Sequence, residues 1–319
     1  MNKKASFPPL VFFGTPEFAK HCLAYLIKAS FPVLAVVTAP DRKSGRGKKI
    51  TTSAVKDYAL SRKIPVLQPI NLNSTDFIDK LQELNAKIYA VVAFRMLPKI
   101  VWSLPPLGTI NLHASLLPNY RGAAPINWVL INGEKKTGVT TFLIDGEIDS
   151  GALLMRESIQ IHADYNFKIL HDKLLKIGAP LLSKTLLKLS TKSLIAKRQE
   201  ELEHLKMAPK LNSENTCILW NNPLDAILNQ IRGLSPYPGA WTTLNNNGEY
   251  LRIKIFDAET LKTVHFHDKG QVVEQDSKLM IATADGYLIC KEIQLPNKKR
   301  MSVSALLNGY SVGSNARIH

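Results

Sequence analysis

The hydrophobic pattern of the first half of the chain differs from that of its last third, and this difference limits the folds available. In the first half, short apolar runs such as 10–13 and 33–37 alternate with amphipathic segments. Apolar strands separated by helices are typical of a mainly parallel sheet with helices on both faces, a doubly wound α/β fold. In the last third, apolar runs are joined by turn signals such as Asn247-Gly248, which predict antiparallel hairpins and a small β-barrel.

The spacing of apolar residues also predicts the individual elements. Strands are expected over 10–13, 33–37, 88–93, 109–112 and 139–144, with helices over 18–28, 76–84 and 164–189. Further strands are expected over 240–244, 251–256, 278–282 and 287–290, after a helix that Pro223 opens and Gly233 ends at its C-cap. Ligands of doubly wound sheets bind beyond the carboxyl ends of the strands. Functional residues are therefore expected directly after strands.

The length of 319 residues suggests about two domains. The segment 190–207 is charged and poor in aromatic residues, which is typical of a linker. We therefore expect a catalytic domain over 1–189, a linker over 190–207 and a β-barrel domain over 208–319.

Composition excludes several classes of protein. With 45% hydrophobic residues and a mean hydropathy of −0.05, the chain is not a disordered one. It has no apolar run long enough to span a membrane, and Pro8 and Pro9 interrupt the only candidate for a signal peptide. Its three cysteines fit neither a disulfide framework nor a zinc site, so we expect a cytoplasmic protein without a metal.

The net charge of +15 favours an anionic partner such as a nucleic acid. A solvated basic surface would give the same charge, so charge alone does not decide between the two. The cations are dense over 38–49, where five of them accompany one anion and two glycines. Because this segment follows a strand, it lies on the ligand side of the sheet, where it suits capture of a phosphate backbone. The alternative is a solvated surface loop.

Two groups of polar residues lie at the end of a strand or directly after one. Asn111 and His113 share one face of their strand, because side chains alternate with period two. A carboxamide beside an imidazole can stabilise an oxyanion and move a proton, although such a pair can also merely fix the end of a strand. Asp149 follows the strand expected over 139–144 and can orient or charge His113. Its alternative is a plain turn, since aspartate and glycine are turn residues in any protein.

Several motifs together resemble the methionyl-tRNA formyltransferase family. They are FGTPEFA over 13–19, APDR over 39–42 with GRGKK over 45–49, NLHASLLP over 111–118 with RGAAP over 121–125, IDSG over 148–151, APKL over 208–211, IRGLSPYPGAW over 231–241 and KRM over 299–301. Asn111, His113 and Asp149 alone indicate only the wider folate-dependent formyltransferase superfamily. The basic segment and the second domain narrow the resemblance to methionyl-tRNA formyltransferases, across nearly the whole chain.

The resemblance implies a formyltransferase-type, Rossmann-like catalytic domain, an OB-like barrel, and transfer of a formyl group from 10-formyltetrahydrofolate to methionine on initiator tRNA, for translation initiation. It assigns catalysis to Asn111, His113 and Asp149, and we expect the protein to be a monomer. The residues that it assigns to folate are Phe94, Met96, Leu97, Ser115, Leu116, Leu117 and Pro118. We expect tRNA to be bound by the cations of the basic segment and by those of a turn in the barrel, although the barrel could be a purely structural appendage with solvated cations. These residues are Arg42, Lys43, Arg46, Lys48, Lys49, Lys298, Lys299 and Arg300.

The chain departs from the family pattern at Arg95, which stands where a glycine is common, and at Ala152, where an aspartate is common. Two other functions stay open. A small-molecule acceptor could replace tRNA, and a protein that only binds RNA would need no catalytic residues.

Overall fold

The computed structural model describes residues 7–44 and 49–319, without the side chains of Lys43, Ser44 and Lys49. The chain forms two compact units, each assembled from separate stretches. The first comprises residues 1–122, 137–159 and 172–207, and the second comprises 123–136, 160–171 and 208–319. No helix among the described residues is both long and apolar enough to cross a membrane.

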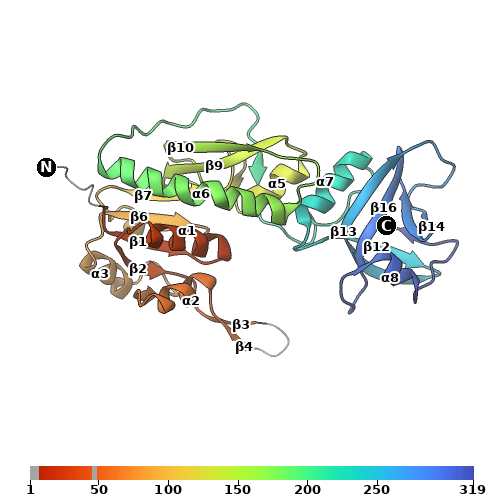
Figure 1. Ribbon diagram of the computed structural model, residues 1–319, viewed down its shortest axis with the longest axis horizontal. Coiled ribbons are helices and arrows are strands. Elements are labelled where there is room, and N and C mark those ends of the chain that lie inside the picture. The colour runs from red at the N-terminus through yellow and green to blue at the C-terminus, as the bar shows by residue number, and fades with distance from the viewer. Residues whose placement is uncertain (1–6, 45–48) are drawn as a thin grey trace. The chain divides into compact units, whose positions relative to one another are not determined.

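A seven-stranded sheet forms the centre of the first unit, in the strand order β10-β9-β7-β6-β1-β2-β5 (Figure 1). Its strands are β1 (Leu10–Gly14), β2 (Val33–Val37), β5 (Val66–Leu67), β6 (Ile88–Val92), β7 (Thr109–His113), β9 (Lys136–Leu143) and β10 (Leu153–Gln160). Strands β5, β2, β1, β6 and β7 pair in parallel, whereas β9 runs antiparallel to β7. The sequence-based prediction of a mainly parallel sheet is confirmed.

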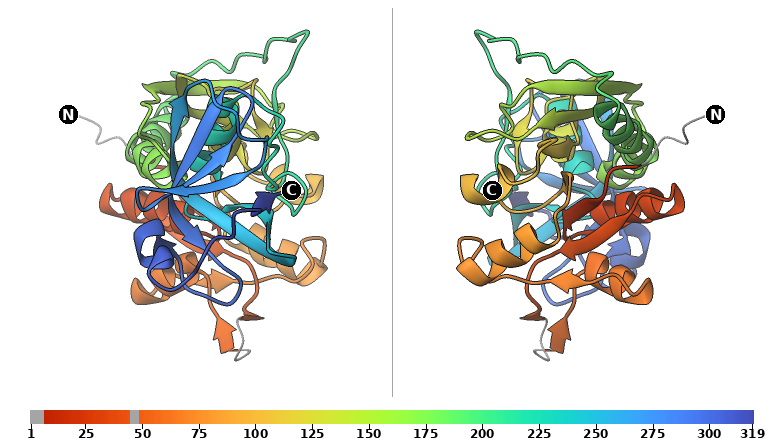
Figure 2. Two further views of the ribbon diagram at one scale, coloured as in Figure 1. Left: turned by 90° about the vertical axis from the view of Figure 1, so that its right-hand side faces the viewer. Right: turned by 90° about the vertical axis from the view of Figure 1, so that its left-hand side faces the viewer.

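Helices cover both faces of this sheet (Figures 1 and 2). On one face, Val11 and Phe13 of β1 pack in a core with Phe77 and Leu81 of α3 (Thr75–Glu83) and with Val101 of α4 (Lys99–Trp102). On the other face, Gly178 of α6 (Phe167–Ser190) lies close to Leu112 of β7 and to Phe18 of α1 (Glu17–Lys28). The fully buried strands explain why the apolar runs are continuous rather than alternating.

The basic segment after β2 is a hairpin. Strands β3 (Arg42–Ser44) and β4 (Lys49–Thr51) pair antiparallel and project from the first unit (Figure 1). In the sequence they precede α2 (Ala54–Ser61). Asp41, at the base of the hairpin, accepts hydrogen bonds from Lys56 of α2 and from Gln68. The hydrogen bond from Lys56 and, to a lesser extent, that from Gln68 hold the pKa of Asp41 below its usual value.

The second unit contains a nearly closed antiparallel barrel with the strand order β14-β15-β16-β13-β12-β18, and Figure 2 (left) shows its strands. They are β12 (Ala240–Asn246), β13 (Glu249–Lys262), β14 (Val272–Gln275), β15 (Lys278–Ala282), β16 (Gly286–Gln294) and β18 (Arg317–Ile318); the short β17 (Met301–Ser302) pairs with β16. Two backbone hydrogen bonds bring the β14 edge and the β18 edge of the sheet together. They run from the N–H of Val272 to the oxygen of Ala316 (2.8 Å) and from the N–H of Ile318 to the oxygen of Gly270 (2.9 Å). The predicted OB-like barrel is confirmed.

Helices α5 (Pro125–Ile131), α7 (Leu224–Leu234) and α8 (Val303–Leu307) accompany the barrel. The prediction that Gly233 caps α7 is wrong, because the helix continues to Leu234 and ends at Ser235. A Cβ at Gly233 would lie 2.8 Å from Ile131 and 3.1 Å from the backbone oxygen of Asn127, both on α5. Gly233 is therefore required for close helix packing rather than for a turn.

Two further expectations differ at strand boundaries. The strand expected over 88–93 ends at Val92, because Ala93 has a left-handed φ of 48°. Strand β14 was not predicted from the sequence. It is joined to β15 by Asp276 and Ser277, whose φ values of 50° and 58° make the tight turn without a glycine.

Candidate active site

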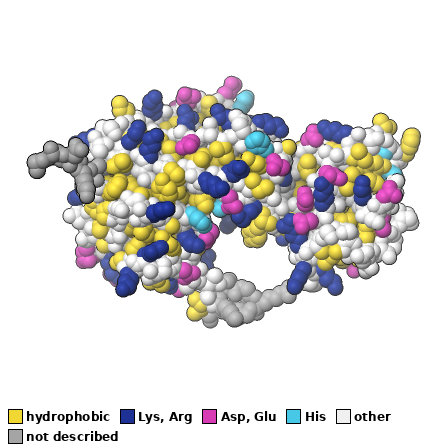
Figure 3. Space-filling model, viewed as in Figure 1, with side chains coloured by type: hydrophobic (Ala, Val, Ile, Leu, Met, Phe, Trp, Pro, Cys, Tyr) yellow, Lys and Arg dark blue, Asp and Glu magenta, His cyan; other side chains and the backbone are white. Residues whose placement is uncertain are grey.

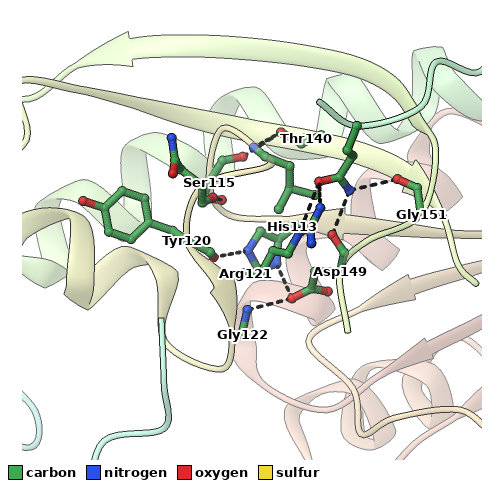
Figure 4. A network of polar contacts seen from close by, with 11 residues as sticks. His113, Ser115, Tyr120, Arg121, Gly122, Thr140, Asp149 and Gly151 are labelled. Atoms are coloured by element: carbon green, nitrogen blue, oxygen red, sulfur yellow. Dashed lines mark hydrogen bonds and ion pairs between the residues drawn. The ribbon is translucent and has the colours of Figure 1, made fainter. Parts of the chain in front are cut away.

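The candidate site lies at the carboxyl end of β7 (Figure 4). Asn111 and His113 lie two positions apart on that strand. The side-chain oxygen of Asn111 is buried and has no hydrogen-bond partner among the described residues. A buried carbonyl without a partner costs about 1–3 kcal/mol. Asn111 is thus a polar group that a ligand can satisfy.

His113 is 6% exposed, and both of its ring nitrogens have neighbours. Its Nε2 lies 2.8 Å from the backbone oxygen of Tyr120. Because a carbonyl oxygen only accepts, this contact places a proton on Nε2. Its Nδ1 lies 3.6 Å from Oδ2 of Asp149, which is too far for a direct hydrogen bond but close enough for charge attraction. Nδ1 is therefore the nitrogen that can exchange a proton next to a carboxylate.

Asp149 is held by contacts to its side chain and to its backbone. Its Oδ2 accepts a hydrogen bond of 2.9 Å from the backbone N–H of Gly122 (Figure 4). Its φ of 52° lies in the left-handed region, which costs about 1–3 kcal/mol at a residue other than glycine. Such a conformation persists only where neighbouring contacts impose it.

Gly151 shows why this loop is more than an ordinary turn. A Cβ at Gly151 would lie 1.7 Å from the backbone oxygen of Leu143, so only glycine fits at this position. The close approach is fixed by a hydrogen bond of 2.9 Å from the backbone N–H of Leu143 to the oxygen of Ala152. The loop is thus packed tightly against the end of β9, two residues after Asp149.

The segment after His113 is built around Thr140 of β9. The hydroxyl of Thr140 donates to the backbone oxygen of Ser115 (2.7 Å) and accepts from the N–H of Leu117 (3.2 Å). The guanidinium of Arg156 donates to the backbone oxygen of Leu117 at 3.0 Å. These bonds fix the backbone of residues 115–118, one of the two stretches assigned to folate.

The seven residues assigned to folate differ in exposure. Met96 is exposed, Phe94, Leu116 and Pro118 are half-buried, and Leu97, Ser115 and Leu117 are buried. Their assignment to folate stays a prediction. The four accessible members can offer apolar side chains to a ligand, whereas the buried three can offer little beyond backbone atoms.

Arg95, the departure from the family pattern, does not point into a free space. Its guanidinium donates to the backbone oxygens of Ile70 and Pro69, and so ties two loops together. Loss of hydration, and secondarily the nearby charge of Arg42, lowers the pKa of Arg95 from its ordinary value.

The residues assigned to tRNA lie in both units, and this assignment also stays a prediction. Arg42 is exposed on β3; Lys43 and Lys49 belong to the hairpin, but their side chains, like the whole of Arg46 and Lys48, lie outside the described residues. Lys298 and Lys299 are exposed between β16 and β17. Arg300 is paired with Glu292 and lies 4.6 Å over the ring of Phe256. On the face shown in Figure 3 the cations are dispersed, so charge density does not mark a single binding surface on that face.

Two of the cysteines, Cys22 and Cys290, are buried and are not reactive groups. Burial raises the pKa of the Cys290 thiol to about 12 and that of Cys22 still further, so neither is a thiolate at neutral pH. Within residues 7–44 and 49–319, no group of three or more His, Cys, Asp or Glu side chains is arranged to hold a metal ion.

The sequence did not point to Gln199 or Arg121 as site residues. Gln199 is 6% exposed and contacts the loop of Asp149, although it comes from the segment predicted as a linker. Arg121 belongs to the RGAAP motif and donates to Gln199 at 2.7 Å. The only sequence signal for Arg121 is its motif, and for Gln199 there is none.

Comparison with known proteins places this site in a family. A family model described as formyl transferase matches residues 9–186, and one described as formyl transferase, C-terminal domain, matches residues 210–311. The methionyl-tRNA formyltransferase of Flavobacterium johnsoniae is 48% identical over 97% of this chain and 98% of its own length. The chain belongs to the methionyl-tRNA formyltransferase family. The enzyme of that name from Bacteroides fragilis is 44% identical over 94% of both chains.

Solved structures share the fold. The structure of WlaRD, a sugar 3N-formyl transferase, in the presence of dTDP and 5-N-formyl-THF, matches with a TM-score of 0.64 over 92% of this chain and 99% of that one. Its identity to this chain is 19%, so the match speaks for the architecture alone.

Proposed function

We propose that this protein transfers the formyl group of 10-formyltetrahydrofolate to the α-amine of methionine esterified to initiator tRNA. The observation that carries the proposal is the grouping of Asn111, His113 and Asp149 around the end of β7, with Nδ1 of His113 facing the Asp149 carboxylate at 3.6 Å. Similarity to methionyl-tRNA formyltransferases over 97% of the chain supports the choice of substrates.

The reaction needs an oxyanion site and a proton path. The neutral amine attacks the formyl carbon, and the resulting tetrahedral intermediate carries an oxyanion that the side-chain N–H of Asn111 and the positive charge of protonated His113 stabilise. The amine then loses one proton, N10 of the folate gains one, and the bond between N10 and the formyl carbon breaks. Asp149 supports the charged imidazole of His113 while the proton moves. This step uses neither a covalent enzyme intermediate nor a metal.

A formylation assay tests the proposal and separates it from the two alternatives. Methionyl initiator tRNA, uncharged tRNA, free methionine and an amino sugar nucleotide are each supplied with 10-formyltetrahydrofolate. Transfer to methionyl-tRNA alone is expected. Transfer to the sugar nucleotide instead would indicate a small-molecule acceptor, and tRNA binding without any transfer would indicate a protein that only binds RNA.

The Arg42→Ala variant is expected to raise the KM for methionyl-tRNA about 10- to 100-fold, which corresponds to the loss of one charged hydrogen bond. Arg42 is exposed on the hairpin after β2, on the ligand side of the sheet. Steady-state kinetics with tetrahydrofolate affinity measured in parallel checks this prediction. Arg62→Ala, at an exposed arginine next to Tyr58, is the control. Equal losses of affinity for both substrates would contradict the assignment of Arg42.

Replacement of both Lys298 and Lys299 by alanine is expected to weaken tRNA binding and leave folate binding unchanged. The slope of log affinity against log salt should become shallower by about 0.7 to 0.9 for each phosphate group that the variant no longer binds. Lys278→Ala, at an exposed lysine of the same barrel, is the control. If the double variant and the control keep the same slope, these two lysines do not bind phosphates.

We also propose that the protein acts in the cytoplasm as a monomer.

The predicted domain boundaries at residues 189 and 208 also remain a proposal. In it, residues 1–189 carry the chemistry and residues 208–319 bind the tRNA body. Residues 123–136, which include α5, pack in the same compact unit as the barrel. Single substitutions in the full chain are therefore better tests of the barrel than a truncation.

A further inference from the structure

The side chain of Gln199 is fully engaged in hydrogen bonds at the candidate site. Its Oε1 accepts from Nε and Nη2 of Arg121, at 3.2 and 2.7 Å. Its Nε2 donates to the backbone oxygens of Asp149 (2.8 Å) and Gly151 (2.9 Å), and Figure 4 shows these carbonyls in the network around His113. A carboxamide is the only uncharged side-chain group that can accept on one arm and donate twice on the other.

The segment that carries Gln199 is itself fixed to both loops of the site. Lys197 forms two backbone hydrogen bonds with Leu153, of 2.7 and 2.9 Å, at the start of β10. At its other end, the backbone of Lys206 accepts from the N–H of Tyr120 and donates to the side chain of Asn119 at 3.1 Å. The segment thus contacts the loop of Asp149 and the loop of Tyr120, whose residues flank the two nitrogens of His113.

The backbone of Asp149 requires such a constraint. Its left-handed φ of 52° is unfavourable for a residue other than glycine, and in this conformation its carboxylate accepts a hydrogen bond from the Gly122 N–H. We propose that Gln199 is a positioning residue, which fixes the carbonyls of Asp149 and Gly151 so that the Asp149 carboxylate stays opposite Nδ1 of His113. Through Arg121, the same side chain joins this loop to the loop after β7. The catalytic consequence rests on the proposed formyl transfer, whereas the structural one does not.

One substitution can remove the hydrogen bonds of the Gln199 amide nitrogen while keeping those of its oxygen. In Gln199→Glu the carboxylate keeps the contact with Arg121 but cannot donate to the two carbonyls. A second variant, Gln199→Met, fills similar space without either arm. Gln82→Glu makes the same change at an exposed position on α3 and serves as the control.

Single-turnover formylation with both substrates saturating is the kinetic test. The rate is expected to fall about 10- to 100-fold in Gln199→Glu and at least as far in Gln199→Met, because a displacement of about 1 Å in a catalytic group has this effect. The KM for 10-formyltetrahydrofolate should stay within about twofold of the unmodified value, since the folate residues are not moved. Gln82→Glu should leave the rate unchanged.

A double-mutant cycle distinguishes positioning from a general structural role. If Gln199 acts through Asp149, then Gln199→Glu lowers the rate no further once Asp149→Asn is present. Independent, multiplied losses would overturn the proposal, because they would show that Gln199 affects the reaction without Asp149.

Amide exchange tests the structural claim without any activity. In protein labelled with 15N-glycine, the Gly122 amide reports on its bond to the Asp149 carboxylate, and the Gly108 amide, bonded to Pro105, is the internal control. Exchange at Gly122 should become about tenfold faster in Gln199→Glu and stay unchanged in Gln82→Glu. Unchanged exchange at Gly122 in both Gln199 variants would overturn the positioning role. If the unmodified protein shows no formyl transfer, while Gly122 exchange is still faster in Gln199→Glu than in the unmodified protein, the proposed function is overturned and the positioning role is not.

Discussion

Asp149→Asn is expected to lower formyl transfer by a factor of about 100 or more. The side chain keeps its shape, and its amide oxygen can still accept from Gly122, so the loop should remain in place. What is lost is the negative charge 3.6 Å from Nδ1 of His113. Without it, the imidazolium that forms during proton transfer has no counter-ion. The measurement is the single-turnover rate, with circular dichroism to confirm the fold.

Glu147→Gln is the matched control, because it removes one negative charge from an exposed position in the same loop. It should leave the rate unchanged. His113→Ala should resemble Asp149→Asn, and the double variant should lose little more than either single one, since residues that act as a unit are not additive. A normal rate in folded Asp149→Asn would remove this carboxylate from the mechanism.

Asn111→Ala is the second substitution with a large expected effect, a loss of about 100- to 1000-fold in turnover, as is typical when one oxyanion donor is removed. The carboxamide of Asn111 lies on β7, two positions before His113, and its buried oxygen has no partner among the described residues. The substitution removes the side-chain N–H groups that would donate to the oxyanion. Because the buried oxygen has no partner in the described part of the chain, its loss costs no hydrogen bond there, and we expect the fold to stay stable. Thermal unfolding and single-turnover kinetics together check both parts.

The control for this second prediction is Asn73→Ala, an exposed asparagine before α3 in the same unit. Its rate and its melting temperature should match those of the unmodified protein. A large fall in the melting temperature of Asn111→Ala would show that Asn111 mainly supports the strand, which is the alternative that the sequence left open. A normal rate would exclude Asn111 from oxyanion stabilisation.

The architecture of both units and the catalytic candidates could be predicted from local sequence. A parallel sheet buried on both faces leaves continuous apolar runs, such as those of β1 and β6, and polar residues that end a strand must lie at the edge where ligands bind. Asn111 and His113 share one face through the period of a strand, which is a local property. Asp149 was found because its loop follows the next strand of the sheet.

Only the tertiary structure could decide which distant segments meet. Gln199 lies 50 positions from Asp149 and 78 from Arg121, and nothing in its charged, aromatic-poor surroundings distinguishes it from a residue of a linker. In the same way, Gly233 has the local features of a helix cap, but its contact with α5 shows that it is needed for packing. Hydrophobic period and turn residues describe each element by itself. Contacts such as these depend on the path of the whole chain, which brings together groups that are far apart in the sequence, so that the side chain of Gln199 finds its hydrogen-bond partners and α7 packs on α5 at Gly233.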